Sequence, residues 1–467
     1  MVLCNRCKLE TMDVHWKGRP CVKRDGGPCL VSQEDMELER KIQELQDRRR
    51  NLHTRMNASH DPFILTFPPE ISSHIFLLSL QEWDYDPVYG DKYWCNGITK
   101  GLPTPFLLSS ICRGWRQLAR STPMLWTTLT FTLAKPAKGP LVETVRDWLL
   151  LSGGLPLDIC VSSYEGEDPA SEEMYSPVID ALNQHSGRWR ELYLRIPAPY
   201  VRHFHGSFPP NSLYRLDVSN CTSRREFDGP LPTFRMNFKP SPTDLTMRKI
   251  RFSVNDIGWS NLTSLSMESM TFNECIMAIR HAPLLESCTM EEIDSDQGDV
   301  AIAKTKIRHM HLRTLDIHFM REDLSIEFLG LMELPVLEAF CYEPMDIAMV
   351  DCLFSFLSRS ENRLKELALY GNLGEEFPVE GLKKLLDATP FLQCLEFYGF
   401  REGVSALDEV LQELSSSAPI LAGGTPGFLP HLQSFTFSNC YVSKWEYIPS
   451  IYTWPHRKLL RMDLPLT

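Results

Sequence analysis

Hydrophobic and polar positions repeat along the second half of the chain. The template Leu-x-x-Leu-x-Leu-x-x-Asn/Cys, with Val or Phe in place of some leucines, starts at Leu213, Leu364 and Leu432. Looser copies, most of them about 20–30 residues apart, start at Trp189, Met247, Leu262, Leu285, Leu312, Leu337, Leu392 and Leu459. Helical stretches separate several copies, at residues 275–281, 350–358, 381–388 and 406–414. This strand-then-helix alternation predicts an α/β fold (α+β over the whole chain) with parallel strands.

The repeated template resembles the leucine-rich-repeat family over residues 132–467. The resemblance implies an irregular solenoid, in which the Cys or Asn after each strand satisfies backbone groups of the turn. Residues 222–260 fit the template poorly and residues 132–187 fit it only in part. An ordinary α/β domain is the alternative.

Residues that alternate with the buried positions of these strands are expected to form a binding face for a target protein, since such repeats bind along the strand side. The candidate target-binding residues mix charge with aromatic rings, as protein interfaces do; they are Tyr193, Arg195, Arg215, Asp217, His318, Tyr370 and Tyr398. Asp316, Glu366 and Glu396 occupy equivalent positions. Any one of them alone is also consistent with an ordinary solvated residue.

Residues 34–60 are predicted to form a helix with a heptad stripe. Apolar residues are spaced alternately by four and three, with Arg49 at one seam position; they are Leu38, Ile42, Leu45, Leu52 and Met56. We expect this stripe to dock onto its own chain, with dimerisation as the alternative.

Residues 61–131 are predicted to form a helical module. Pro68 and Pro69 precede an apolar helix with Glu70 in its first turn, which suits the helix dipole. Ile71, Ile75, Phe76 and Leu78 are expected on one face of it. After a Gly/Pro/Tyr-rich loop at residues 82–105, a second helix is predicted over residues 106–119, and Ser121-Thr122-Pro123 ends it.

The module resembles an F-box, in particular those of fungal F-box proteins that carry a preceding helix. The positions that match the F-box pattern, in order, are Pro68, Glu70, Ile71, Ile75, Phe76, Cys112, Trp115, Arg116, Leu118, Ala119, Pro123, Leu125 and Trp126. Phe67 replaces the usual leucine, and the loop between the helices is longer than in the compact form. An ordinary helical hairpin is the alternative.

The F-box resemblance implies a Skp-family adaptor as partner and, through it, a cullin of a ubiquitin ligase. The expected adaptor-binding residues are Pro68, Pro69, Glu70, Ile71, Ile75, Leu107, Leu108 and Ile111, whereas Trp115 and Trp126 are expected in the core of the module. The chain would then be a substrate receptor that performs no chemistry, with an unidentified protein as target. A scaffold without ligase recruitment is the second hypothesis.

Residues 1–33 form a short basic segment with Cys4, Cys7, Cys21 and Cys29. Four thiolates can bind one zinc ion, although the spacing of the second cysteine pair is wrong for a zinc ribbon. The run also faintly resembles a fungal binuclear zinc cluster, but the binuclear-cluster family needs six cysteines. A zinc-dependent regulatory or DNA-binding protein is the third hypothesis, and incidental cysteines are the alternative.

Composition narrows the classes further. The chain has 467 residues, 43% hydrophobic and 23% charged, so it can bury a core. A net charge of −12 argues against a nucleic-acid binder. Because we find neither a secretory signal nor an apolar run of roughly 20 residues, we expect a cytoplasmic or nuclear protein outside the membrane, with reduced cysteines. Common phosphate-loop, zinc-protease and nucleophile-elbow motifs are absent from the sequence, so we expect no enzyme and no cofactor.

Overall fold

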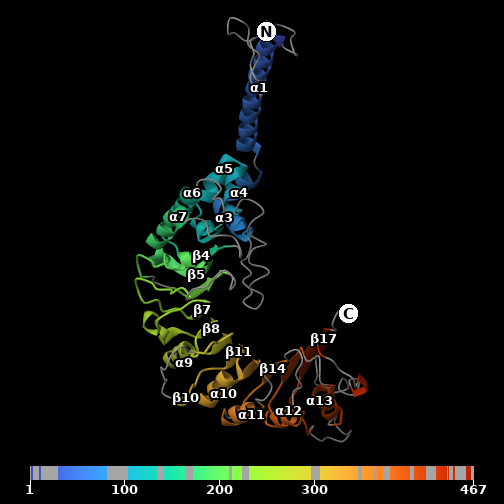
Figure 1. Ribbon diagram of the computed structural model, residues 1–467. Coiled ribbons are helices and arrows are strands. Elements are labelled where there is room, and N and C mark those ends of the chain that lie inside the picture. The colour runs from blue at the N-terminus through green and yellow to red at the C-terminus, as the bar shows by residue number, and fades with distance from the viewer. Residues whose placement is uncertain are drawn as a thin grey trace. The chain divides into compact units, whose positions relative to one another are not determined.

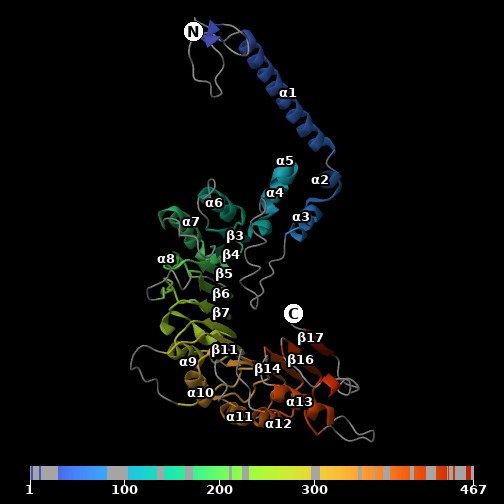
Figure 2. The same ribbon diagram turned by 45° about the vertical axis from the view of Figure 1, so that its right-hand side comes forward.

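The computed structural model describes most of the chain as two compact units, Met1–Trp126 and Thr127–Thr467. The described residues are 2–3, 10–11, 30–60, 62–80, 104–133, 141–163, 172–209, 213–222, 231–295, 305–344, 350–360, 363–371, 379–399, 404–416, 427–438, 440, 445–447 and 459–463. Figures 1 and 2 label the elements of both units.

The first unit is helical apart from a short antiparallel strand pair, β1 (Val2–Leu3) and β2 (Glu10–Thr11). Its helices are α1 (Leu30–His60), α2 (Pro62–Thr66), α3 (Pro69–Leu78), α4 (Thr104–Ile111) and α5 (Arg113–Arg120), followed by the 3-10 turn η1 (Pro123–Trp126). Pro68, which precedes helix α3, is extended (φ −55°, ψ 149°). Pro69 at the first helical position disfavours helical backbone in the residue before it.

The predicted N-terminal helix forms as α1, but its heptad stripe is exposed. Leu38, Ile42, Leu45, Leu52 and Met56 are all exposed to solvent. The expected docking of this stripe onto its own chain is therefore wrong for the described residues. The charged faces of α1 carry local ion pairs such as Arg40–Glu44, which stabilise the helix without tertiary packing.

The second predicted helix of the module is broken at Cys112. This residue is extended (φ −153°, ψ 176°), and its Sγ accepts a hydrogen bond from the Trp115 amide (3.4 Å), so it caps α5. The Arg116 Nε donates to the Ser109 carbonyl (2.9 Å), which satisfies a backbone acceptor at the end of α4. Two short helices therefore replace the single predicted one.

Aromatic rings form the core of the helical unit. The Phe76 ring stacks on that of Phe63 with centroids 5.7 Å apart, and Trp115 lies 4.8 Å from Phe76. Trp126 is fully buried and donates its indole N–H to the Ala119 carbonyl (2.8 Å). A buried Trp needs such a partner for its polar nitrogen. Trp126 thus lies in the core, as expected, whereas Trp115 is half-buried and packs its ring against the core residue Phe76.

The second unit contains a 13-stranded sheet whose strands follow one another in chain order, β3 to β17, with β10 and β12 outside it. All neighbouring strands of this sheet are parallel. The predicted α/β fold with parallel strands is therefore confirmed. The strands are β3 (Thr128–Thr132), β4 (Leu157–Ser162), β5 (Trp189–Ile196), β6 (Arg215–Asn220), β7 (Asp244–Arg248), β8 (Ser264–Glu268), β9 (Ser287–Glu291), β11 (Thr314–Met320), β13 (Ala339–Pro344), β14 (Glu366–Tyr370), β15 (Cys394–Tyr398), β16 (Ser434–Ser438) and β17 (Leu459–Asp463).

The first strand of the sheet falls inside the segment that we expected in the helical module. Residues 128–132 form β3 and pair with β4, so the module ends at Trp126 rather than at residue 131. The alternating Thr128-Leu129-Thr130-Phe131-Thr132 run has the period of a half-buried strand, which explains the correction.

Helices connect many of the parallel strands, and Figure 1 shows α9 to α13 in succession along one side of the sheet. The helices are α6 (Leu141–Leu151), α7 (Glu172–Gln184), α8 (Ala198–Val201), α9 (Phe272–His281), α10 (Glu322–Leu331), α11 (Val350–Arg359), α12 (Val379–Asp387) and α13 (Val404–Ser416). The four predicted helical stretches are confirmed as α9, α11, α12 and α13. Short elements complete the unit: η2 (Ser186–Arg188), η3 (Val254–Asp256), η4 (Trp259–Asn261), η5 (Trp445–Tyr447) and the parallel pair β10 (Ile307–Arg308) and β12 (Met332–Glu333).

A repeated backbone arrangement marks the end of several strands. The residue after β7, β8 and β9 has positive φ (Lys249 54°, Ser269 56°, Glu292 50°). Its N–H donates to a backbone carbonyl near the end of the next strand of the sheet, which is that of Glu268, Glu291 and His318 respectively. Phe319 (φ 52°) and Gly399 (φ 81°) occupy equivalent positions after His318 and Tyr398. Because non-glycine residues adopt this conformation rarely, its recurrence identifies these segments as copies of one structural unit.

The leucine that opens each repeat is a core residue. Leu262, Leu285, Leu312, Leu337 and Leu364 are all buried, as are the alternate strand residues that follow them. Burial of each such side chain contributes about 1.5–3 kcal/mol to folding. The apolar positions of the template thus pack inward and leave the alternate residues of each strand on the opposite side.

Two adjacent leucines test this packing directly. Leu285 is 0% exposed whereas Leu284 is 45% exposed. We expect Leu285→Ala to lower the free energy of unfolding by about 2–5 kcal/mol, because a buried cavity replaces the side chain. Leu284→Ala should change it by no more than about 0.5 kcal/mol. Urea unfolding followed by tryptophan fluorescence measures both; equal effects would contradict the assigned core.

Candidate functional site

Apolar side chains are exposed on two helices of the helical unit. Ile71 (48% exposed), Ile75 and Leu78 lie on α3, and Leu107 (51% exposed) and Ile111 lie on α4. Helices α3 and α4 both pack on α5, which fixes their backbones. We call these five residues the apolar strips. Exposed apolar side chains gathered on short helices are typical of a protein-binding surface.

The structure separates the expected adaptor-binding residues into exposed and buried ones. Pro68, Pro69 and Glu70 are exposed at the start of α3, together with Ile71 and Ile75, and Leu107 and Ile111 are exposed on α4. Leu108 is buried, which corrects its expected surface position. Phe76 is also buried, on the opposite side of α3 from Ile71, Ile75 and Leu78, so the four do not share one face.

The second candidate surface is the set of alternate, non-core residues of β3 to β16, which we call the strand face. The register aligns them in rows across the sheet, for example Glu291, His318 and Glu343 on β9, β11 and β13. A second row carries Asp316, Cys341, Ala368 and Glu396 on β11 to β15. All seven predicted target-binding residues belong to such rows, but the sheet divides them into two groups.

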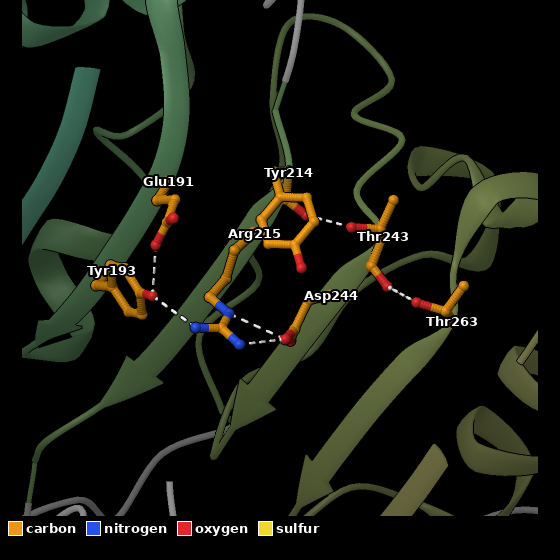
Figure 3. A network of polar contacts seen from close by, with 7 residues as sticks. All are labelled: Glu191, Tyr193, Tyr214, Arg215, Thr243, Asp244 and Thr263. Atoms are coloured by element: carbon orange, nitrogen blue, oxygen red, sulfur yellow. Dashed lines mark hydrogen bonds and ion pairs between the residues drawn. The ribbon is translucent and has the colours of Figure 1, made fainter. Parts of the chain in front are cut away.

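The first group comprises Tyr193, Arg195, Arg215 and Asp217 on β5 and β6. Figure 3 shows the hydrogen bonds that Tyr193 and Arg215 make with each other and with their neighbours. The Tyr193 hydroxyl donates to Glu191 Oε2 (2.7 Å) and accepts from Arg215 Nη1 (2.9 Å). The Arg215 guanidinium also donates twice to Asp244 Oδ2 (2.9 and 2.6 Å). Burial, with smaller contributions from the Glu191 hydrogen bond and charge, raises the pKa of Tyr193 although Arg215 opposes the shift.

Two members of this first group are inaccessible. Tyr193 and Asp217 are buried, and Asp217 accepts a hydrogen bond from Ser219 (3.0 Å). The expected role of Tyr193 and Asp217 in direct contact with a target is therefore corrected to a structural one. Arg195 and Arg215 are half-buried and take part in contacts within the chain.

The second group, His318, Tyr370 and Tyr398, lies together on β11, β14 and β15. The His318 and Tyr370 rings are 5.8 Å apart, and the Tyr370 and Tyr398 rings are 5.2 Å apart. Tyr398 is 43% exposed, while His318 and Tyr370 are half-buried. Among the described residues, this part of the strand face therefore presents partly exposed aromatic rings.

Carboxylates surround His318. Its Nδ1 is 3.0 Å from Glu343 Oε2, and its Nε2 is 3.7 Å from Cys341 Sγ. Burial alone would lower the pKa of His318, but the hydrogen bond and charge of Glu343, with the charges of Asp316 and Glu291, raise it above 6.5. The imidazole is thus held in its protonated form more strongly than a free histidine.

The acidic surroundings act on neighbouring groups as well. Burial, the Cys341 thiol and the charges of Glu396, Glu343 and Asp316 raise the pKa of Tyr370. Burial and these three carboxylates also raise the pKa of the Cys341 thiol. These shifts have one common cause beside burial, which is an excess of negative charge on this part of the face.

Glu291, Cys341 and Glu343 were not among the residues predicted from the sequence. The sequence nevertheless contained the pattern that identifies them. The template copies that start at Leu285 and Leu337 place Cys288, Met290, Phe340 and Tyr342 inward. The residues between and after them must then point outward. Reading every loose copy in register, rather than the clearest copies alone, would have found all three.

A cavity of about 440 Å³ lies elsewhere in the second unit, lined by residues that include Arg280, Lys306, Arg308 and His309. Its histidine has a structural role: His309 Nε2 donates to the Ala282 carbonyl (2.8 Å) and its Nδ1 accepts from the Leu312 amide (3.2 Å). Burial lowers the pKa of His309, which keeps the ring neutral in this arrangement.

The possible zinc ligands Cys4, Cys7, Cys21 and Cys29 lie outside the described residues. Among the residues that are described, no helix combines the length and the apolar character needed to cross a membrane. No protein-family model matches the chain, and a search of curated proteins also finds no match.

The protonation of His318 can be tested by NMR. We expect its pKa to lie above 6.5 and to fall on Glu343→Gln, because the substitution removes the negative charge 3.0 Å from Nδ1. A raised folded-state pKa stabilises the fold fully below pH 6.5, and this contribution is lost as the pH rises through the folded-state value. His309 serves as the internal control, with a pKa below 6.5 in both proteins. A His318 pKa at or below 6.5 in the unaltered chain contradicts the described contact.

Proposed function

We propose that the chain is a substrate-receptor subunit of a cullin-based ubiquitin ligase. In this proposal the helical unit is an F-box that binds a Skp-family adaptor, and the second unit binds a target protein. The observation that carries the proposal is the exposure of Ile71, Ile75, Leu107 and Ile111, four apolar residues that the F-box resemblance assigns to the adaptor.

The energetics of the helical unit favour a partner. Phe76, Leu108, Leu125 and Trp126 already fill the core, so the apolar strips have no remaining space inside the module. Each exposed aliphatic side chain would gain about 1.5–3 kcal/mol on full burial in an interface. A partner with a complementary apolar surface therefore provides a physical reason for this exposure.

The second unit suits the role of a target-binding domain. We propose that it is an irregular leucine-rich-repeat solenoid, supported by the buried leucine that opens each repeat and by the recurring left-handed residue after the strands. Such repeats present a long strand face, and the aromatic group at Tyr370 and Tyr398 offers an anchor of the kind that is enriched in protein interfaces.

A receptor of this kind acts by proximity. The adaptor would hold the chain on the ligase, and the strand face would hold the target at a high effective concentration near the ligase. Ubiquitin transfer would then be performed by other subunits, and the chain would contribute binding alone.

Charge introduced into the apolar strips tests the proposal. We expect Ile71→Glu or Leu107→Glu to reduce co-purification of a Skp-family adaptor with the full chain by at least about tenfold, because a carboxylate would be buried unpaired in the interface. Affinity capture followed by quantitative immunoblotting measures the loss. Circular dichroism of each variant checks that the helical unit remains folded.

Leu284→Glu is the matched control, since Leu284 is 45% exposed but lies in the second unit. It should leave adaptor capture unchanged. If the unaltered chain captures no adaptor, or if all three variants capture it equally well, the receptor proposal is wrong and a scaffold without ligase recruitment takes its place.

A further inference from the structure

Charge is distributed unevenly along the strand face. On β4 to β7, acidic residues are matched by nearby arginines: Arg190 pairs with Asp158, and Arg215 pairs with Asp244 (2.6 Å). On β9 to β15, the face positions carry the carboxylates Glu291, Asp316, Glu343, Glu366 and Glu396. His318 is the one basic side chain among the described face positions of these later strands.

The described residues around the acidic part of the face neutralise it only in part: the charge of Arg248 on β7 acts on Glu291. Arg313 and Lys365, which lead into β11 and β14, both contact Glu338 (2.7 and 2.9 Å) rather than the face carboxylates. Among the ion pairs of the described ranges, the one that involves this group of carboxylates joins Glu343 to His318. Burial is the largest cause of the raised pKa values of Glu291 and Tyr370, and neighbouring carboxylates contribute to both shifts.

The sequence that follows these strands adds acidic residues. Glu292, Asp294, Asp296 and Asp299 follow β9, and Glu375 and Glu376 follow β14. The basic residues Lys304, Lys306 and Arg308 also follow β9, and Arg321 and Arg401 follow β11 and β15; of these, Lys306 pairs with Glu333 and Arg321 pairs with Asp323. The negative charge therefore extends in the sequence beyond the strands themselves.

Aromatic rings lie within this acidic surface. Tyr370 and Tyr398 form a tilted pair (centroids 5.2 Å, 40° between planes), and Glu396 lies on the same strand as Tyr398, at the next outward position. A ring face attracts a cation through its quadrupole, and a carboxylate beside it adds direct charge attraction. The two features are independent, and both favour a positively charged side chain.

We propose that the part of the strand face formed by β9 to β15 binds a protein segment rich in lysine or arginine. Tyr370 and Tyr398 contact the cationic side chains. Glu396 supplies opposite charge at the next outward position from Tyr398, and Glu366 supplies it further along the same strand as Tyr370. This inference rests on the proposed function for the statement that the segment belongs to a ubiquitination target, and it defines the chemistry of that target. Nucleic acid is excluded from this surface, because its phosphates would be repelled by the same carboxylates.

Direct binding of short peptides tests the inference. Fluorescence anisotropy of the full chain, at low and high salt, compares a labelled lysine–glycine peptide with a glutamate–glycine peptide of equal length. We expect binding of the lysine peptide alone, weakened as salt rises because the attraction is electrostatic. The double variant Glu366→Gln/Glu396→Gln should weaken it by about threefold to tenfold, and Tyr398→Leu by about threefold.

A matched double variant controls for net charge. Glu380 and Asp387 are exposed on α12, and Glu380→Gln/Asp387→Asn removes the same number of charges from that helix. It should leave peptide affinity within experimental error of the unaltered chain. Equal weakening by both double variants, or equal binding of both peptides, overturns the inference in favour of non-specific attraction.

Divalent cations provide a further arm of the test. Calcium or magnesium chloride should weaken binding of the lysine peptide no more than sodium chloride does at the same ionic strength. Stronger competition that is lost in the Glu366→Gln/Glu396→Gln variant would show a metal site and overturn the assignment to a peptide.

The two proposals fail in distinguishable ways. Ile71→Glu should retain binding of the lysine peptide, and Glu366→Gln/Glu396→Gln should retain adaptor capture. Loss of adaptor capture in the unaltered chain refutes the receptor function alone, whereas absence of lysine-peptide binding refutes the partner chemistry alone.

Discussion

The second unit depends on the parallel pairing of each strand with its neighbour in the chain. Every strand of the 13-stranded sheet from β4 to β16 uses both edges for this pairing, and its side chains alternate between the core side and the other side. Leu285, Leu312 and Leu337 anchor successive strands from the core side. The register that aligns these leucines also aligns Glu291, His318 and Glu343 on the other side, so core packing fixes the geometry of the candidate binding face.

The same backbone frame supports two kinds of polar surface. Near β5 to β7, Tyr193, Arg215 and Asp244 satisfy one another, and such a network stabilises the local register without leaving groups for a partner. Near β11 to β15, carboxylates outnumber basic side chains, and the Tyr370–Tyr398 ring pair remains accessible. The part of the strand face at β5 to β7, where polar groups bond to one another, is thus structural. The part at β11 to β15, where carboxylates are in excess, is the candidate recognition surface.

The helices and strands with a strong hydrophobic period could be predicted from the sequence. Residues 34–58 and the four stretches before β9, β14, β15 and β16 form helices as expected, and the parallel sheet follows from their alternation with strands. Helix α10 was missed, because Glu322–Leu331 follows its strand with a single intervening residue and lacks a separate boundary signal. The helix break at Cys112 was also missed, since it depends on a thiol cap and on Arg116 reaching back to Ser109, neither of which has a periodic signal.

Burial of individual side chains was harder to predict than the elements. Leu107 and Leu108 are adjacent and chemically identical, yet the first is exposed and the second is buried, because a helix turns by about 100° per residue and packing on α5 selects the side. Tyr193 and Tyr398 both alternate with core positions of their strands, but Tyr193 is buried beneath the Arg215 guanidinium whereas Tyr398 is exposed. Such differences depend on the neighbouring strand, which a single segment does not specify.

Hydrogen–deuterium exchange of the full chain, with and without a purified Skp-family adaptor, tests the division of labour between the two units most directly. The receptor proposal predicts slower exchange on adaptor binding in residues 68–78 and 104–111, with the strand face of β9 to β15 unchanged and free for a target. Protection confined to the second unit, or no change in either unit, would contradict it.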